Sequence, residues 1–445
     1  MKTSIATMHK ALLDGTTTVV KVVSKYLDNI EKYNHKLSGY NYIDAEAALN
    51  KASMLDKQLP SFDGKLPPLF GIPYSVKDNI NVAGMPTSCS SHSMSETEPP
   101  HKSAVVVNRM ENAGAICLGK ANCHEFAFGG PSFDLPTAPA TNPWKEGYFP
   151  GGSSSGSGTT VAGDMCMASL GTDTAGSIRS PSAYCGLVGL KPTYGNLPLS
   201  GVHPLSISLD HVGPLANSVD DCWRIYKVMS GSEAPETLEA KNKAITIGVP
   251  EPSWGINSLL QPDMLHAYQQ TINSLKQDGV KVIPIRLPNL QEFHVACAII
   301  MMAEVAQLFG PLVRKNFNLY GEVFRNRALV GERINATAYI RAIQTKLHLQ
   351  QEMDKFFNEV DAIMLPGAVS GATALTEVDK FYFLVSPNIN AIANVTGQPV
   401  VSLPIGMNEK GLPLGIQLLG KRNHEQPLFS AAATIEKLIT WRHHE

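Results

Sequence analysis

Hydrophobic positions in the first 60 residues recur at the spacing of helices. Val19, Val23, Leu27 and Ile30 lie three or four residues apart, which places them on one face of a helix over about residues 19–33. A second helix is predicted at about residues 45–55, and the Pro/Gly-rich residues 59–68 end it. We therefore expect the chain to begin with helices.

Shorter apolar runs follow and predict buried strands. Residues 70–77 and 115–119 are apolar over four to eight positions, and residues 104–113 between them have helical spacing. Lys77 stands at the end of the first of these strands.

Beyond residue 240, predicted strands and helices alternate. Strands are expected at 245–249, 280–284 and 360–366, long helices at 292–318 and 335–357, a hairpin from 400–404 and 414–418, and a last helix at 425–439. No internal repeat is found. The pattern predicts an α/β fold with a mixed, mainly buried β-sheet covered by helices on both faces.

A Gly/Ser-rich segment occupies about residues 150–180. Such composition usually marks a flexible linker. Here it continues directly into an apolar, helix-like stretch at 161–168 and then into core-grade residues 170–173. We therefore expect the segment to belong to the folded core.

Composition narrows the class of protein. Of 445 residues, 43% are hydrophobic and 17% charged, and the net charge is −2. A nucleic-acid surface needs clustered Lys and Arg to displace phosphate counterions, and no run of five like charges occurs. We expect one large domain, residues 1–445, that binds no nucleic acid.

The expected location is the cytoplasm. Residues 1–6 lack the apolar stretch of a secretory signal, and no 18-residue uncharged apolar run exists. The seven cysteines are scattered without CxxC spacing, which disfavours a disulfide framework or a zinc site. No membrane association is expected.

Three short motifs match known patterns incompletely. Residues 114–120 resemble a phosphate loop, but Ala121 stands where Ser or Thr would hold Mg²⁺, so a strand is favoured. Residues 152–156 match the G-x-S-x-G elbow without the strand that should precede it. Cys123-His124-Glu125 and His443-His444-Glu445 lack a second ligand cluster. No metal and no cofactor are expected.

Two serines and a lysine make chemical sense together. Ser177 follows small residues, whose backbone N–H groups could stabilise an oxyanion. Ser153 lies 24 positions upstream, and Lys77 is a candidate base. Lysine acts as a base only when burial keeps it neutral. An ion pair of Lys77 with Asp78 or another carboxylate is the equally supported alternative.

Five ordered segments resemble the amidase signature family. They are residues 71–79 (GIPYSVKDN), 150–158 (PGGSSSGSG), 171–181 (GTDTAGSIRSP), 185–195 (CGLVGLKPTYG) and 208–214 (SLDHVGP). The resemblance covers about residues 69–214 and, more weakly, 388–419. Residues 240–390 correspond to the variable part that forms the family's substrate pocket.

The resemblance implies the catalytic residues. The family's lysine falls on Lys77, its bridging serine in a cis peptide on Ser153, and its nucleophile on Ser177. The 24-residue separation of the serines is kept. The implied oxyanion donors are the backbone amides of Thr174, Ala175, Gly176 and Ser177. Ser154, Asp173 and Arg179 are expected to fix the loop geometry. Ser155 and Ala175 stand where relatives often have Gly.

The implied activity is hydrolysis of a carboxamide-type C–N bond in a small molecule through a serine acyl-enzyme. Phe128, Gly129 and Gly130 are the expected substrate-binding residues. Residues 381–386, with Phe128 and Phe133, indicate either an aromatic acyl pocket or ordinary core. Ureas and carbamates remain possible substrates, and a homodimer remains possible.

Two alternatives remain. The chain could be the glutaminase subunit of a glutamine-dependent tRNA amidotransferase, although residues 128–136 and 201–206 look more like stand-alone amidases. It could also be a binding protein on a degenerate amidase fold, which the intact Lys77, Ser153 and Ser177 disfavour.

Overall fold

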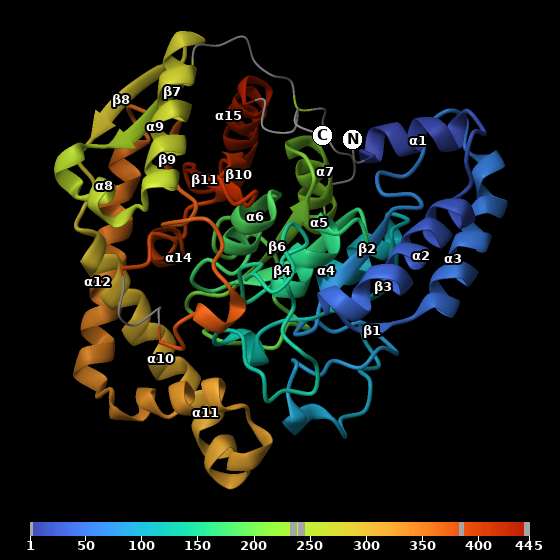
Figure 1. Ribbon diagram of the computed structural model, residues 1–445, viewed down its shortest axis with the longest axis horizontal. Coiled ribbons are helices and arrows are strands. Elements are labelled where there is room, and N and C mark those ends of the chain that lie inside the picture. The colour runs from blue at the N-terminus through green and yellow to red at the C-terminus, as the bar shows by residue number, and fades with distance from the viewer. Residues whose placement is uncertain (1–2, 232–237, 239–244, 382–386, 440–445) are drawn as a thin grey trace.

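A long mixed β-sheet organises the chain (Figure 1). The computed structural model describes residues 3–231, 238, 245–381 and 387–439. Within these residues one sheet has eleven strands in the order β1-β3-β2-β4-β6-β5-β10-β11-β9-β7-β8. The strands are β1 (Tyr40–Ile43), β2 (Pro73–Lys77), β3 (Ile116–Ala121), β4 (Ala168–Asp173), β5 (Val188–Lys191), β6 (His211–Ala216), β7 (Thr246–Pro250), β8 (Lys281–Ile285), β9 (Ala362–Pro366), β10 (Val400–Met407) and β11 (Pro413–Leu419).

The sheet mixes parallel and antiparallel pairs. β2 runs parallel to β3 and β4, and β7 runs parallel to β8 and β9. The central strands β4, β6, β5, β10, β11 and β9 pair antiparallel in that order. Every residue of β2, β3, β4, β5, β6, β9 and β11 is buried, including polar ones such as Lys77, Asp173 and His211. The predicted α/β class and the mixed, mainly buried sheet are confirmed.

Helices cover both faces of this sheet. α5 (Ser155–Ala162) and α6 (Arg179–Cys185) pack together on one face, while α7 (Val219–Met229) and α15 (Glu425–Leu438) pack on the other. On β11, a Cβ at Gly415 would lie 3.0 Å from Ala183 of α6. Just beyond the strand, Gly420 faces Leu428 of α15 at 2.9 Å.

The Gly/Ser-rich segment forms the buried helix α5, not a linker. All its residues from Ser155 to Val161 are buried. A Cβ at Gly156 would lie 2.4 Å from the backbone nitrogen of Asn122 and from the carbonyl oxygen of Gly39, so only glycine allows this approach. The helix ends at Ala162, and the predicted helix-like stretch at 161–168 leads instead into β4.

The N-terminal helices have side-chain caps. Ser4, Thr18 and Asp44 accept hydrogen bonds from backbone amides in the first turns of α1 (Ile5–Leu13), α2 (Val19–Leu37) and α3 (Ala45–Gln58). Between α2 and α3 the short edge strand β1 pairs with β3, so the first 60 residues are not entirely helical.

The remaining helices belong mainly to the C-terminal half. They are α4 (Val105–Asn112), α8 (Ile256–Leu259), α9 (Pro262–Gln277), α10 (Leu290–Lys315), α11 (Glu322–Ala328), α12 (Ala336–Phe356) and α14 (Ala391–Thr396). Short 3₁₀ helices are η1 (Leu59–Ser61), η2 (His92–Met94), η3 (Glu125–Ala127), η4 (Pro252–Trp254), η5 (Phe317–Leu319), η6 (Val330–Arg333) and η7 (Leu375–Glu377).

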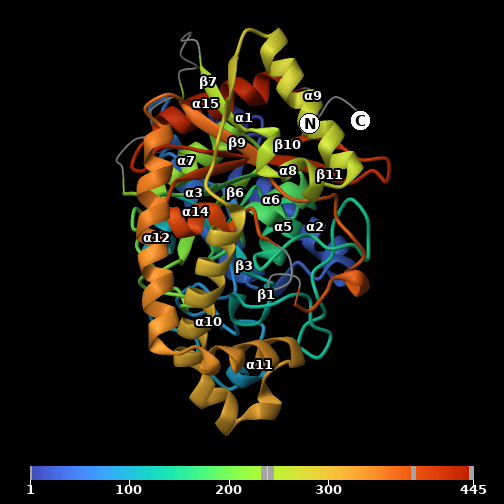
Figure 2. The same ribbon diagram turned by 90° about the vertical axis from the view of Figure 1, so that its left-hand side faces the viewer.

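α10 is the one described helix whose length and composition would allow it to cross a membrane. Half of its most apolar 18-residue window is buried. It packs against α12 and α14, and Figure 2 shows α10 and α12 running side by side. Core helices of globular proteins share this composition.

Candidate active site

Lys77 ends β2 on the face covered by α5. Its side chain is fully buried, and Nζ lies 2.7 Å from Ser153 Oγ and 2.7 Å from Thr172 Oγ1. Ser75, two residues earlier and therefore on the same face of the strand, bonds Thr160 of α5. Lys77 thus reaches a serine that the sequence places 76 positions away.

The ion-pair alternative for Lys77 fails because Asp78 has another partner. The Asp78 carboxylate lies 3.0 Å from Lys120 Nζ and accepts a 2.8 Å hydrogen bond from Asn41. Lys120 stands inside β3 and also donates to Thr87 Oγ1 at 2.8 Å. This placement confirms that residues 114–120 lead into a strand.

Burial adjusts the acidity of Lys77. Loss of hydration lowers the pKa of its ammonium to about 8, and the negative groups around it oppose that shift only partly. A lysine with this pKa is neutral in about a tenth of the molecules at pH 7 and in about half of them at pH 8. It can therefore accept a proton from Ser153.

Ser153 follows a cis peptide bond between Gly152 and itself. Its carbonyl oxygen accepts a 3.1 Å hydrogen bond from the His124 amide. The resemblance implied both this cis bond and the contact with Lys77.

Ser154, the central serine of the G-x-S-x-G match, is structural. Its hydroxyl donates to the Thr172 carbonyl at 3.0 Å and accepts from the Thr172 amide at 3.2 Å. Its own amide donates to the Ser177 carbonyl at 3.3 Å. These bonds join the Ser153 loop to the loop that carries Ser177.

Asp173 organises the loop from β4 to α6. Its carboxylate accepts hydrogen bonds from the amides of Gly176 (2.8 Å) and Ile178 (3.1 Å) and pairs with Arg179 at 3.0 Å. Burial would raise the pKa of Asp173, but Arg179 holds that pKa well below its usual range. Asp173 is therefore a buried anion that fixes the backbone on both sides of Ser177.

Arg179 connects this loop to the C-terminal part of the chain. Its guanidinium donates to the Asn390 carbonyl at 2.9 Å and to Gln417 Oε1 at 3.0 Å. Asn394 donates to Asp173 Oδ1 at 2.9 Å. No motif in the sequence pointed to Asn390, Asn394 or Gln417. Their only signal was the weaker resemblance over 388–419.

One predicted oxyanion donor must be corrected. The Gly176 amide donates to Asp173, so it cannot also donate to a substrate oxygen in this arrangement. Thr174, Ala175 and Ser177 line the cavity, and their amides remain the predicted donors. The Thr174 hydroxyl donates to Asp210 at 2.6 Å, a contact that no motif indicated.

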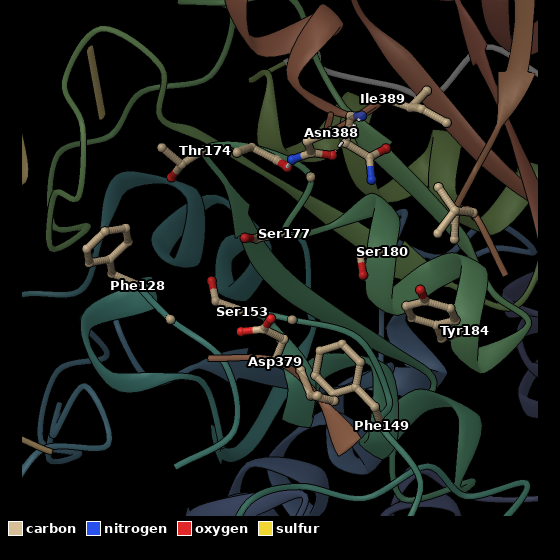
Figure 3. A pocket seen from close by; sticks show the side chains of 18 of the residues that line it. Phe128, Phe149, Ser153, Thr174, Ser177, Ser180, Tyr184, Asp379, Asn388 and Ile389 are labelled. Carbon is tan, nitrogen blue, oxygen red and sulfur yellow. Dashed lines mark hydrogen bonds between the residues drawn. The ribbon is translucent and has the colours of Figure 1, made fainter. Parts of the chain in front are cut away.

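A cavity of about 300 Å³ opens beside these groups. Ser153 and Ser177 lie close together in Figure 3, with Phe128 on one side and Phe149 and Tyr184 on the other. Phe128 and Gly129, two of the three expected substrate-binding residues, line the cavity. Gly130 is not among the described lining residues, and its Cβ position instead faces Arg327 at 3.9 Å.

Charged and amide side chains also line the cavity. Arg327 from α11 is 1% exposed, and Glu377, Asp379, Asn388 and Asn390 complete this polar part of the lining. None of the five was predicted, because they belong to the variable part of the chain and carry no local motif.

The aromatic-pocket hypothesis is met only in part. Residues 382–386 lie outside the described residues. Phe133 is 65% exposed and is therefore neither core nor pocket. Phe128 lines the cavity, and Phe149 and Tyr184 join it there.

The Cys123-His124-Glu125 run does not converge on one point. His124 Nδ1 lies 2.9 Å from the Gly129 carbonyl, and its ring stacks on Phe149 at 5.9 Å. Burial lowers the pKa of His124 to about 3, so the ring is neutral. Glu125 instead bonds Ser91 and the Gly321 amide. Within the described residues no cluster has the composition of a metal site, and residues 443–445 lie outside them.

Comparisons with known proteins identify the family of the chain. The family model described as Amidase matches residues 21–429. The glutamyl-tRNA(Gln) amidotransferase subunit of Prochlorococcus marinus (strain NATL2A) is 32% identical, over 97% of this chain and 96% of that protein.

Two solved structures are similar over nearly the full length. A crystal structure described as an amidase is 28% identical with a TM-score of 0.89, covering 98% of this chain and 100% of the other. The glutamyl-tRNA(Gln) amidotransferase subunit from Thermotoga maritima is 26% identical with a TM-score of 0.79, covering 96% and 93%. The chain therefore belongs to the amidase signature family of hydrolases that act on C–N bonds.

Proposed function

We propose that this protein is an independent amidohydrolase whose nucleophile is Ser177, activated through Ser153 by Lys77. The observation that carries the proposal is the 2.7 Å contact between Lys77 Nζ and Ser153 Oγ, in a cavity that Ser177 also lines. A serine hydroxyl is a weak nucleophile until a base takes its proton. A buried lysine with a pKa of about 8 is such a base.

The reaction runs in two halves. Neutral Lys77 takes the Ser153 proton while Ser153 takes the Ser177 proton, and Ser177 Oγ forms a bond to the substrate carbonyl carbon. The loop amides at 174, 175 and 177 hold the oxyanion. The C–N bond then breaks as the relay returns its proton to the leaving nitrogen. Water, deprotonated by the same relay, hydrolyses the acyl-enzyme and restores Ser177.

We infer that the substrate is small and polar. A volume of about 300 Å³ lies at the lower end of the range for small-molecule sites. Arg327 offers a cation, and Glu377 and Asp379 offer carboxylates, on the wall of the same cavity. Phe128, Phe149 and Tyr184 provide flat apolar surface. A short amide, urea or carbamate that bears an ionised group fits this lining better than a long acyl chain.

The test is a substrate panel with the purified protein. Short-chain amides with and without a terminal carboxylate, ureas and carbamates should be compared with glutamine, with product ammonia or amine as the readout. Turnover of at least one small amide or urea by the chain alone, lost in Ser177→Ala, supports the proposal. Turnover that persists in Ser177→Ala would refute it.

A second function is supported by the relatives: the glutaminase subunit of a tRNA amidotransferase. Curated relatives at 29–32% identity are named as glutamyl-tRNA(Gln) amidotransferase subunits, and Arg327 and Asp379 could pair with the two charges of an amino acid. The TM-score of 0.89 to an amidase, against 0.79 to an amidotransferase subunit, favours the first proposal. Glutamine hydrolysis that appears only when amidotransferase partner subunits are added would select the second.

A further inference from the structure

Two carboxylates meet the first turn of α11. Glu125 Oε2 accepts a 2.9 Å hydrogen bond from the Gly321 amide, and Asp134 Oδ2 accepts a 2.8 Å bond from the Glu322 amide. The first amides of a helix have no partner within the helix, and a carboxyl oxygen can accept from them whether or not the group is ionised. Burial raises the pKa of Glu125 to about 7, so the hydrogen bond itself, not a full charge, makes this contact. Glu125 and Asp134 thus fix where α11 begins.

The contact with Glu125 leaves no room for a side chain at position 321. A Cβ there would lie 2.9 Å from Glu125 Oε2 and 2.8 Å from Leu135 Cδ2, closer than real side chains approach. Glu125 is itself held on its other side, where Oε1 accepts a bond from Ser91 Oγ at 2.5 Å. The carboxylate is therefore clamped between the loop that contains Ser91 and the start of α11.

The same loop also reaches the cavity. Residues 124–135, which we call the clamp loop, carry Glu125 and Asp134 as well as the cavity residues Phe128 and Gly129. α11 carries Arg327, whose Nη1 lies 3.6 Å from the Cβ position of Gly129. Its guanidinium carbon lies 6.0 Å from the Phe128 ring centre. The clamp loop and α11 therefore touch at both ends of the helix.

Aromatic packing between the clamp loop and α11 does not by itself fix the orientation of α11. Phe126 packs against Phe309 and Phe324 with ring centres 4.9 and 5.3 Å apart. Apolar contact is non-directional, so rings alone permit rotation or sliding of a two-turn helix. The two carboxyl–amide hydrogen bonds are directional, and they remove that freedom.

We propose that Glu125 and Asp134 are positioning residues that hold α11 in the orientation that presents Arg327 to the cavity, and that they thereby set the affinity of the site for anionic substrates. The proposal rests on the proposed function in one respect, which is that Ser177 reacts with a molecule bound beside Arg327. Neither carboxylate touches the reacting atoms.

The experiment uses two fluorophosphonate probes that label Ser177, identical except that one ends in a carboxylate and the other in a methyl ester. Labelling is followed by mass spectrometry at several probe concentrations, which separates the half-saturation concentration from the maximal rate. The variants are Glu125→Ala, Asp134→Ala and Glu125→Gln. The matched control is Asn326→Ala, because Asn326 is an exposed residue of α11 that directly precedes Arg327.

For Glu125→Ala, the half-saturation concentration of the carboxylate probe should rise about tenfold, a cost typical of a displaced binding group. The maximal rate, and both constants for the ester probe, should stay within about twofold. Glu125→Gln keeps one acceptor for the Gly321 amide and should restore most of the affinity. The control Asn326→Ala should match wild type.

A double variant separates positioning from general loosening. When Arg327→Ala is already present, adding Glu125→Ala should weaken the carboxylate probe no further, because both changes remove the same interaction. Additive losses, or equal losses for both probes, would overturn the proposal. If Glu125→Ala does not fold, the exposed Asp134 supplies the same test, and a wild-type response of Asp134→Ala would overturn the proposal.

The two proposals fail differently. A wild-type protein that labels at Ser177 but hydrolyses none of the amides would refute the proposed function and leave the probe comparison intact. Variants that bind the carboxylate probe as wild type does, in a protein that hydrolyses amides, would refute only the role of Glu125 and Asp134.

Discussion

At the scale of the residue, the proposed catalysis depends on the environment of Lys77. A fully buried lysine is expected to be paired with a carboxylate or to be neutral. Asp78 is bonded to Lys120, and the nearest polar partners of Lys77 are the hydroxyls of Ser153 and Thr172. From the sequence, ion pair and base were equally supported, because Lys77 and Asp78 are adjacent in the chain. The two interpretations are separated only in the folded chain, where the side chains of Lys77 and Asp78 point in opposite directions from the strand.

The first prediction concerns pH. Because only neutral Lys77 can accept a proton, kcat should rise with pH through its pKa of about 8 and then level off. The pKa is lowered from 10.5, so protonation below about pH 8 removes the base without unfolding the protein. A kcat–pH profile measured from pH 6 to 10 checks this. A bell centred below pH 7 would contradict it.

At the scale of the element, α5 is a helix that the amino-acid composition of its segment does not predict. Gly and Ser have poor helix propensity, so residues 155–162 give no local helix signal. They form a helix because packing against β3 and α6 stabilises it. The residues are small because larger side chains would not fit between these elements. The strands at 73–77 and 362–366 and the hairpin of β10 and β11 were predictable, since each lies in a short, mainly apolar run. β5 and β6 were not, because they contain Gly, Pro, Lys and His whose burial depends on distant partners.

The second prediction compares two glycines of α5. Gly156→Ala should destabilise the fold by more than about 3 kcal/mol, since the new methyl group would meet backbone atoms that cannot move. Gly158→Ala meets side chains at 3.0 and 3.2 Å and should cost about 1–2 kcal/mol. Urea denaturation of both variants gives the two free energies. Equal losses of unfolding free energy in the two variants would contradict the close packing of Gly156 against backbone atoms.

At the scale of the whole molecule, Arg179 joins the two halves of the chain. The Gly/Ser-rich segment at 150–181 was recognisable from its motifs, but its partners Asn390, Asn394 and Gln417 lie more than 200 residues away. Lys77, Ser153 and Ser177, the proposed catalytic residues, could be picked out from the motif resemblance alone. The charged cavity wall of Arg327, Glu377 and Asp379 could not, since its residues come together only in the folded chain.

The third prediction tests that junction. Arg179→Ala removes the partner of Asp173 and leaves a buried carboxylate, which should cost about 3–5 kcal/mol of stability and shift the Ser177 loop. The control Arg422→Ala breaks a half-exposed pair with Asp354 and should cost no more than about 1 kcal/mol. Thermal melting of both variants gives the comparison. A similar loss for the two would mean that Arg179 does not hold the halves together.

The most direct test of the catalytic account pairs kcat with melting temperature in one Lys77→Met preparation. Methionine is unbranched and one heavy atom shorter than lysine, so it keeps most of the side-chain volume and removes the base. If neutral Lys77 activates Ser177 through Ser153, kcat should fall by at least about 10³-fold. The melting temperature at pH 7 should stay level or rise, because a lysine whose pKa is lowered by burial makes the folded state less stable below that pKa. A variant that keeps a tenth of wild-type turnover, or one that is strongly destabilised yet still active, would contradict the account.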